Sequence, residues 1–241
     1  MKKLVALFLV LSVPAFAQTD CRQVPTCEEI GYICSEYACK DVNSLNCPFD
    51  YSKKICWPNE TECKIGSILY SDLKCYDAAC GKTDAIAIVF DPEKRKAFNL
   101  VQEGNYAFGP FEVDVPTLTN GNSTDERDGK ADTAAIVEWH NTNEFGYEYP
   151  AAMHCYNLEE GGLPPHSWWL ATITELKKIY DNKDVLAPAI EYLGATPFDG
   201  YFVSSTEVNH MNAWVILMHT GVVAGGIAKN GARQIRCIMN Y

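Results

Sequence analysis

Hydrophobic residues along the chain follow two kinds of spacing, one typical of β-strands and one typical of helices. Short runs that are rich in β-branched and aromatic residues and end at turn-forming residues predict strands. They cover residues 65–70, 85–90, 201–207, 213–218, 222–227 and 234–239. After a turn at Asp91-Pro92, residues 95–101 are expected to return as the antiparallel partner of residues 85–90.

Helical spacing recurs between the strand-like runs. Asp132 is of a type that caps helices, and it precedes an amphipathic stretch at 133–139. Pro150 suits the first turn of a second helix over 150–156. A further short helix is expected over 185–193. Helices and strands are thus interspersed, and the pattern predicts an α+β domain.

The clearest helix signal lies in residues 167–180. Two adjacent tryptophans, Trp168 and Trp169, lead to Thr172, which lies three residues before Glu175. This is the spacing of a capping box, in which each of the two side chains accepts a hydrogen bond from the other residue's backbone amide. Apolar residues then recur at helical spacing. They are Leu176, Ile179 and Tyr180. The pattern predicts a helix whose start is anchored in the core by the tryptophan pair.

The first 17 residues have the pattern of an export signal. Lys2 and Lys3 precede a short apolar run at 4–13, and Ala15-Phe16-Ala17 is a small-x-small cleavage site. The run is too short to cross a bilayer, and no other stretch is long and apolar enough to do so. These observations predict a signal peptide at 1–17 and a mature protein that is secreted or held at the cell surface.

All eleven cysteines lie beyond the predicted signal peptide. In an exported protein they predict a disulfide framework. They are Cys21, Cys27, Cys34, Cys39, Cys47, Cys56, Cys63, Cys75, Cys80, Cys155 and Cys237. Zinc is the rival explanation for the N-terminal cluster, but that region has no C-x-x-C pair and no histidine. We therefore expect a disulfide-rich module at 18–64 and a larger domain at 65–241, with at least one thiol left over because the number is odd.

Two cysteines stand apart from the N-terminal cluster. Cys155 falls on the second predicted helix, and Cys237 falls on the last predicted strand. They are well placed to bond to each other, which would close a large part of the larger domain into one covalent loop. One sequence does not reveal how the N-terminal cysteines pair.

The chain is acidic, with 31 Asp and Glu residues against 20 Lys and Arg residues and a formal net charge of −11 at pH 7. Nucleic acids and anionic lipids would be repelled by such a chain, so neither is expected as a partner. The basic residues are scattered, apart from a group formed by Lys82, Lys94, Arg95 and Lys96. We interpret this group as a solvated turn between strands.

A polar run at 119–130 raises the question of calcium, because Asp125, Asp128 and nearby Asp132 supply hard oxygen ligands. An EF-hand also needs a glutamate at its twelfth position. Counted so that Asp128-Gly129 occupies positions five and six, the twelfth position is Ala135. The match fails, and we interpret the run as a solvent-exposed loop. No metal and no cofactor are expected.

Enzymatic motifs are also missing from the sequence. It contains no G-x-S-x-G, no G-x-x-x-x-G-K-[ST], no G-x-G-x-x-G and no H-E-x-x-H. Cys155 could act as a nucleophile beside His154, but a cysteine in an exported, cysteine-rich chain is more often in a disulfide. The chain is therefore expected not to be an enzyme.

Six local patterns occur in a fixed order between residues 65 and 241. They are Gly66-Ser67-Ile68-Leu69-Tyr70-Ser71-Asp72, Ala85-Ile86-Ala87-Ile88-Val89-Phe90-Asp91, Asp128-Gly129-Lys130-Ala131-Asp132-Thr133, Trp168-Trp169-Leu170-Ala171-Thr172-Ile173-Thr174-Glu175-Leu176, Ser204-Ser205-Thr206-Glu207 with Ala213-Trp214, and Ile235-Arg236-Cys237. Together they resemble the bacterial Lcl C-terminal domain family, named for the C-terminal domain of a collagen-like adhesin. Ala171 replaces the family's proline, and Val203 stands where an aromatic residue is usual.

The resemblance implies a C-type-lectin-like α+β fold with two main helices and small antiparallel sheets. It also implies a non-catalytic binding or adhesion module for glycans or for host or matrix proteins. The binding surface is then expected in the connection from Asp199 to Trp214, where side chains offer hydrogen-bond donors and acceptors. These are Asp199, Glu207, Asn209, His210 and Asn212. The alternative is a structural, oligomeric subunit of an extracellular surface or pilus-like assembly, with the cysteine-rich module as a contact surface.

Overall fold

The computed structural model describes residues 32–35, 55–58, 60–76, 84–101, 104–118 and 120–241. The predicted signal peptide and most of the predicted cysteine-rich module lie outside these residues. The chain divides into two compact units. Unit 1 comprises Met1–Glu62 and Lys74–Ala85, and unit 2 comprises Cys63–Leu73 and Ile86–Tyr241.

Unit 1 contains two short antiparallel strand pairs among its described residues. β1 (Tyr32–Ser35) pairs with β2 (Ile55–Pro58). β3 (Glu60–Thr61) pairs with β5 (Cys75–Tyr76). Neither pair has the area to bury a core, so covalent cross-links are the expected source of stability for such a module.

The described cysteines support the predicted disulfide framework. Cys63 and Cys75 are each in a disulfide. Cys34 and Cys56 lie opposite each other in the β1–β2 register. Five cysteines fall outside the described residues. They are Cys21, Cys27, Cys39, Cys47 and Cys80.

The first sheet of unit 2 combines strands from the start and the end of the domain. In order across the sheet they are β4 (Ile68–Tyr70), β6 (Ala85–Asp91), β7 (Lys96–Asn99), β14 (Cys237–Asn240) and β9 (Trp169–Leu170). β6 and β7 form the predicted antiparallel pair, with Ile88 opposite Phe98. β6 is buried at every position after its first residue, which explains its unbroken apolar run.

The second sheet of unit 2 is built around the predicted strand at 201–207. In order it contains β12 (Val222–Ala228), β11 (Asn212–Leu217), β10 (Tyr201–Glu207), β13 (Arg233–Gln234) and β8 (Asn105–Tyr106). The predicted last strand at 234–239 is in fact divided. Its first residue ends β13 in this sheet, and its last three residues lie in β14 of the first sheet, with Ile235 and Arg236 between them.

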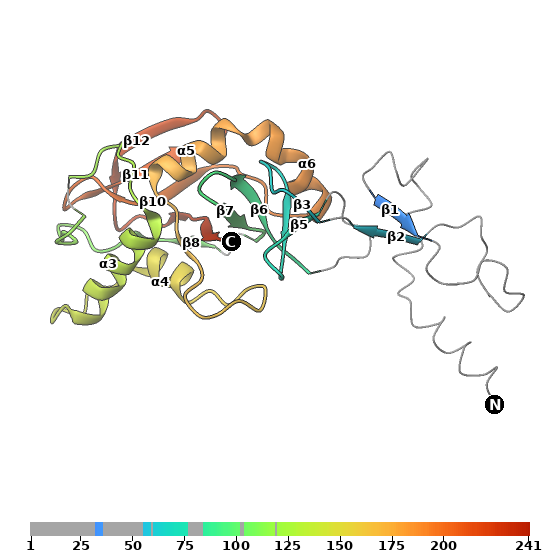
Figure 1. Ribbon diagram of the computed structural model, residues 1–241. Coiled ribbons are helices and arrows are strands. Elements are labelled where there is room, and N and C mark those ends of the chain that lie inside the picture. Colours follow the sequence, from blue (N-terminus) through green and yellow to red (C-terminus); the bar gives the residue numbers. More distant parts are fainter. Residues whose placement is uncertain (1–31, 36–54, 59, 77–83, 102–103, 119) are drawn as a thin grey trace, which may run out of the picture. The chain divides into compact units, whose positions relative to one another are not determined.

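Four helices complete the described part of unit 2, which confirms the α+β class. They are α3 (Gly129–Thr142), α4 (Pro150–Tyr156), α5 (Ile173–Asp181) and α6 (Lys183–Leu193). In Figure 1, α5 and α6 run along one side of the unit, while α3 and α4 lie toward the other. No helix among the described residues is long and apolar enough to cross a membrane.

The capping box predicted before α5 is present. The Thr172 hydroxyl accepts a hydrogen bond from the Glu175 amide at 3.2 Å, and Glu175 Oε2 accepts one from the Thr172 amide at 2.8 Å. Trp168 and Trp169 are almost fully buried, as expected for core anchors. The prediction of this segment from sequence is therefore confirmed at the level of individual side chains.

The predicted start of α3 was wrong. The helix begins at Gly129, and its N-cap is Asp128, whose Oδ1 accepts a hydrogen bond from the Lys130 amide at 3.1 Å. Asp132 lies inside the first turn, where Arg127 binds its carboxylate through two nitrogens. A Cβ atom at Gly129 would approach Glu175 Oε2 to 2.5 Å. The helix therefore starts at a glycine because the capping box of α5 packs against this residue.

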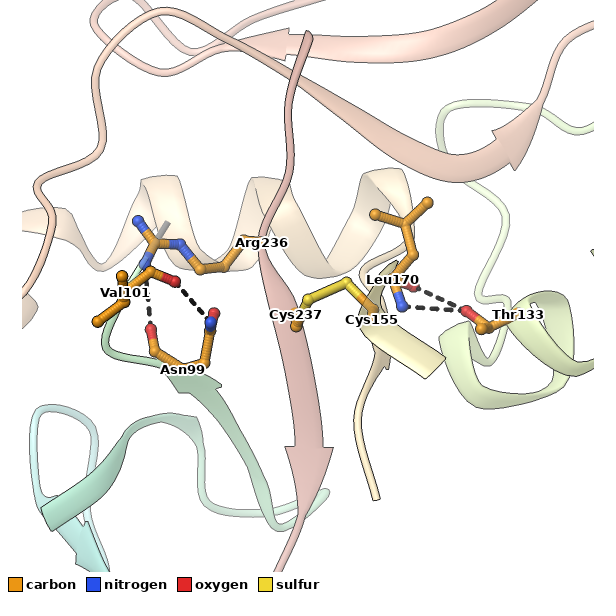
Figure 2. Close-up of a disulfide and its surroundings, with 7 residues drawn as sticks. All are labelled: Asn99, Val101, Thr133, Cys155, Leu170, Arg236 and Cys237. Carbon is orange, nitrogen blue, oxygen red and sulfur yellow. Dashed lines mark hydrogen bonds between the residues drawn. A yellow bond between two sulfur atoms is a disulfide. The ribbon is translucent and has the colours of Figure 1, made fainter. Parts of the chain in front are cut away.

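The predicted disulfide between Cys155 and Cys237 is present, with a Cα–Cα distance of 5.3 Å (Figure 2). It joins α4 to β14 across a sequence separation of 82 residues. Both cysteines are buried in the core. In the chain-entropy model, closing a loop of this length stabilises the fold by roughly 4–5 kcal/mol.

Candidate functional site

The predicted binding surface is not assembled as one site. Asp199 is exposed and lies before β10, whereas Asn209, His210 and Asn212 lie beyond the other end of that strand. A seven-residue strand spans roughly 20 Å, so Asp199 is well separated from the other residues. The structure therefore brings together part of the predicted set, at the β10–β11 hairpin.

Two of the hairpin residues shape the turn. Asn209 Oδ1 accepts hydrogen bonds from the amides of Met211 and Asn212, both at 2.9 Å. The Val113 amide donates to the His210 carbonyl oxygen at 3.1 Å, while the His210 side chain is exposed. Asn209 thus builds the turn with its side-chain oxygen, and His210 is the most exposed residue of this group.

Glu207 is internal, in contrast to its predicted place on a binding surface. Glu207 and Lys229 are fully buried, and Lys229 Nζ lies 2.9 Å from Glu207 Oε1. The second carboxylate oxygen accepts a hydrogen bond from the Val115 amide at 3.0 Å. Lys229 also donates to the Val113 carbonyl and lies 5.0 Å from the centre of the Phe108 ring. Both carboxylate oxygens are occupied, so Glu207 holds the 113–115 loop to the second sheet.

Burial affects both members of this pair. It raises the pKa of Glu207, and the hydrogen bond from Lys229 opposes that shift. It lowers the pKa of Lys229, and the bond to Glu207 opposes that shift too. Each group therefore depends on the other to remain charged inside the domain.

The basic group around residue 95 was only partly interpreted correctly. Lys94 and Arg95 are exposed in the turn between β6 and β7. Lys96 is buried and donates a hydrogen bond to Glu175 Oε1. Lys82 lies outside the described residues. Lys96 differs from its neighbours because it is the first residue of β7, where its side chain meets the capping box of α5.

Arg236 is a third buried cation, and sequence reasoning missed it. It is fully buried beside Cys237, and one of its nitrogens donates to the Asn99 carbonyl at 3.0 Å (Figure 2). Another nitrogen donates to the Thr196 carbonyl, also at 3.0 Å. Three phenylalanine rings surround the guanidinium, with centroid distances of 4.3 to 5.9 Å. They are Phe98, Phe198 and Phe202. Burial lowers the pKa of Arg236 to about 9, so the group is still charged at neutral pH.

The aspartates of the polar run make contacts within the chain. Asp125 Oδ2 accepts from the Asn122 amide at 2.8 Å, Asp128 caps α3, and Asp132 pairs with Arg127. Within the described residues, no group of three or more His, Cys, Asp or Glu side chains is placed to hold a metal ion. The thiol proposed as an alternative nucleophile, Cys155, is in the disulfide with Cys237.

The outer edge of the second sheet is the candidate site that remains. Among the described residues, β12 has one strand neighbour, β11. Its sequence, VVAGGIA, has no charged residue and no proline. Val222 is 56% exposed. The ladder with β11 shifts register between Ala213 and Val215, so the regular part of the edge is at 222–224.

Such an edge presents backbone N–H and C=O groups without a ladder partner, and many proteins protect their edges with lysine or proline. The lysine that follows β12 does not do so. Lys229 turns inward to Glu207 and is fully buried. The edge of β12 is therefore an uncharged strand to which another chain could add.

Comparison with known proteins adds information about the fold. No protein-family model matches the chain, and no curated protein matches it in sequence. The structure is similar to that of a fimbrial protein from Bacteroides ovatus ATCC 8483, with a TM-score of 0.55 and 14% sequence identity. The match covers 74% of this chain and 49% of the fimbrial protein, so it spans about half the length of that protein. At this identity the likeness shows a related fold.

Proposed function

We propose that this chain is a non-catalytic structural subunit of an extracellular surface or pilus-like assembly. The observation that carries the proposal is the uncharged edge strand β12, which lacks the charges and prolines that keep edges from pairing. In the assembly, an extended and uncharged segment of a neighbouring subunit adds to this edge. Main-chain hydrogen bonds then supply affinity, and the small side chains of β12 permit close approach.

The chemistry of the interior supports a structural role. The buried charges of the described residues are engaged inside the domain, as in the Lys229–Glu207, Lys96–Glu175 and Arg127–Asp132 pairs. The Lys229–Glu207 and Lys96–Glu175 pairs and the buried disulfide join segments that are far apart in sequence. Polar interactions of this kind favour one rigid arrangement, which suits a subunit that must keep its shape in a polymer.

The fold and the predicted destination support the same proposal. The similar solved structure is described as a fimbrial protein. Disulfides persist in oxidising environments such as the outside of the cell, so the bonded cysteines of the described residues are consistent with the predicted export signal. Membership of the Lcl C-terminal domain family, with its C-type-lectin-like fold, remains part of this proposal. Adhesion to glycans or to host or matrix proteins is the alternative, for which Asp199 and His210 are exposed.

The proposal can be tested on cells that produce the protein. Antibodies raised against unit 2 are used for immunogold labelling, and material sheared from the cell surface is separated by size under native conditions. A structural subunit is expected on the outside of the cell and in complexes many times its mass of 26.8 kDa. A protein found only as a free monomer in the medium, or only inside the cell, would contradict the proposal.

A further inference from the structure

The loop between α3 and α4 displays an aromatic pair to solvent. Phe145 is 74% exposed, the largest value among the exposed large hydrophobic residues of the described chain. Its ring stacks on Tyr147, with a centroid distance of 5.4 Å and an interplanar angle of 27°. This surface, formed by Phe145 and Tyr147, is called the aromatic pair below. It does not belong to the β12 edge.

The chain holds this loop in one conformation. The Asn143 side-chain amide donates to the carbonyls of Trp139, His140 and Tyr147 at 2.9, 2.9 and 3.2 Å. In return, Asn143 Oδ1 accepts from the Tyr147 amide at 2.8 Å. One side chain therefore joins the end of α3 to the far side of the loop. An aromatic surface that is ordered before binding loses less conformational entropy when a partner arrives.

The base of the loop is fixed as well. The Trp139 indole N–H donates to the Tyr149 hydroxyl at 3.0 Å, and Tyr149 is fully buried. Gly146 between the two rings has φ +69°, and nothing lies within 4 Å of the position its Cβ would occupy. The space beside the pair is therefore open, while the backbone that carries it is anchored in the core.

The charges around the aromatic pair are negative. Glu138, Glu144 and Glu148 are exposed on the end of α3 and in the loop. His140 is the single potential cation between residues 131 and 149. The C-terminal end of a helix also carries partial negative charge, and α3 ends at Thr142. An aromatic face in such surroundings attracts a cation both through its π-electrons and through the nearby carboxylates.

Other aromatic rings in the domain already have a cation from the chain. Lys183 Nζ lies 4.5 Å from the Tyr180 ring centre, Lys130 Nζ lies 5.6 Å from that of Trp169, and Arg95 lies 5.1 Å from that of Tyr241. Within the part of the chain that the structure describes, no lysine or arginine is placed over Phe145 or Tyr147. We propose that the aromatic pair and its flanking glutamates bind a lysine or arginine side chain presented by a partner polypeptide.

The test uses the ¹⁵N-labelled full chain, with its disulfides formed, in an NMR titration. The probe is the peptide acetyl-(Lys-Gly)3-amide, and the same peptide with acetylated lysines is the neutral control. The charged peptide is expected to change the amide chemical shifts of residues 143–148. The acetylated peptide is expected to cause changes that are at least tenfold smaller. Raising the salt concentration should weaken the binding.

Matched variants distinguish binding at the aromatic pair from non-specific electrostatic attraction of the cationic peptide to an acidic protein. Phe145→Ser is expected to weaken binding about two- to fivefold, the range for an exposed cation–π contact. Tyr192→Ser, which removes another exposed aromatic residue on α6, should leave binding unchanged. The combined Glu144→Gln and Glu148→Gln variant should weaken binding and reduce its salt dependence.

Three results would overturn the proposal. The first is a set of shift changes spread over the acidic surface and unaffected by Phe145→Ser. The second is equal binding of the charged and acetylated peptides. The third is a change in the chemical shifts of residues 143–148 with a neutral oligosaccharide but not with the lysine peptide, which would indicate a glycan-binding surface. Because Phe145 is exposed, the Phe145→Ser variant should keep the wild-type spectrum outside the loop. A negative result in this test would not affect the proposed role of β12.

Discussion

Lys229 and Glu207 form an ion pair in which both side chains are fully buried, with 2.9 Å between Lys229 Nζ and Glu207 Oε1. The pair joins the residue after β12 to the end of β10. It also fastens the 113–115 loop, because Glu207 Oε2 accepts from the Val115 amide and Lys229 donates to the Val113 carbonyl. The position that the sequence suggested for ligand binding is therefore a point where the 113–115 loop is joined to two strands of the second sheet.

Breaking this pair on one side should be costly. We expect Glu207→Gln or Lys229→Met alone to lower the free energy of unfolding by about 3–5 kcal/mol, because each leaves an uncompensated buried charge. The double variant should lower the free energy of unfolding by less than the sum of the two single effects. Urea denaturation measures all three, with the exposed Glu191→Gln as the control. If the single variants have free energies of unfolding within about 1 kcal/mol of the wild-type value, the prediction is wrong, because water must then reach the remaining charge.

The disulfide between Cys155 and Cys237 should account for a large part of the stability of unit 2. Replacing both cysteines with alanine is expected to lower the free energy of unfolding by roughly 4–5 kcal/mol, because the unfolded chain is no longer closed over 82 residues. Denaturant unfolding of the variant and of the wild type gives the difference. Peptide mapping without reduction is the companion measurement, and two free thiols at these positions in the wild type would contradict the structure.

Gly129 should not tolerate a side chain. A Cβ atom there would lie 2.5 Å from Glu175 Oε2 and 3.0 Å from the Leu170 carbonyl oxygen. Gly129→Ala is therefore expected to destabilise the protein by about 1–3 kcal/mol through overpacking. Gly226→Ala is the control, since nothing lies within 4 Å of its Cβ position. Equal thermal midpoints for the two variants would mean that α3 and the capping box can move apart.

Tyr149 should titrate at unusually high pH. Burial raises its pKa to about 12, whereas an unfolded tyrosine has a pKa of about 10. A raised pKa in the folded state means that the stability contributed by Tyr149 is fully present below pH 10. It is lost as the pH rises through about 12. The absorbance difference between the wild type and Tyr149→Phe near 295 nm should show this late ionisation, and a difference centred at pH 10 would count against it.

The sequence predicted what depends on local spacing. The Thr172–Glu175 capping box lies within four residues, and the β6–β7 pair needs only a turn at Asp91-Pro92, so neighbouring residues determine both. The buried tryptophans followed from the same local pattern, whereas the Cys155–Cys237 bond was predicted because these two cysteines stand apart from the N-terminal cluster. The α+β class also follows, because it depends on the alternation of helical and strand-like spacing.

Sequence reasoning failed where distant segments decide the outcome. Lys96 lies beside two exposed basic residues, and only its contact with Glu175 explains its burial. Asp132 was assigned the capping role that Asp128 performs, because both precede the helical pattern. Arg236 lies between two short strands of different sheets, and its carbonyl and phenylalanine neighbours come from three other segments. None of these partners is within reach of a local motif.

Two valines with the same exposure allow the role of β12 to be measured directly. Val222 on β12 and Val185 on α6 are both 56% exposed. The Val222→Lys substitution places a charge on the strand edge. The Val185→Lys substitution adds the same charge on α6 and leaves that edge unchanged. The measurement is the fraction of the protein in high-mass complexes from the surface of producing cells, determined by native sedimentation. We predict that Val222→Lys lowers this fraction at least tenfold and that Val185→Lys leaves it at the wild-type level. Equal fractions for the two variants, or a wild type that sediments entirely as a monomer, would contradict the account.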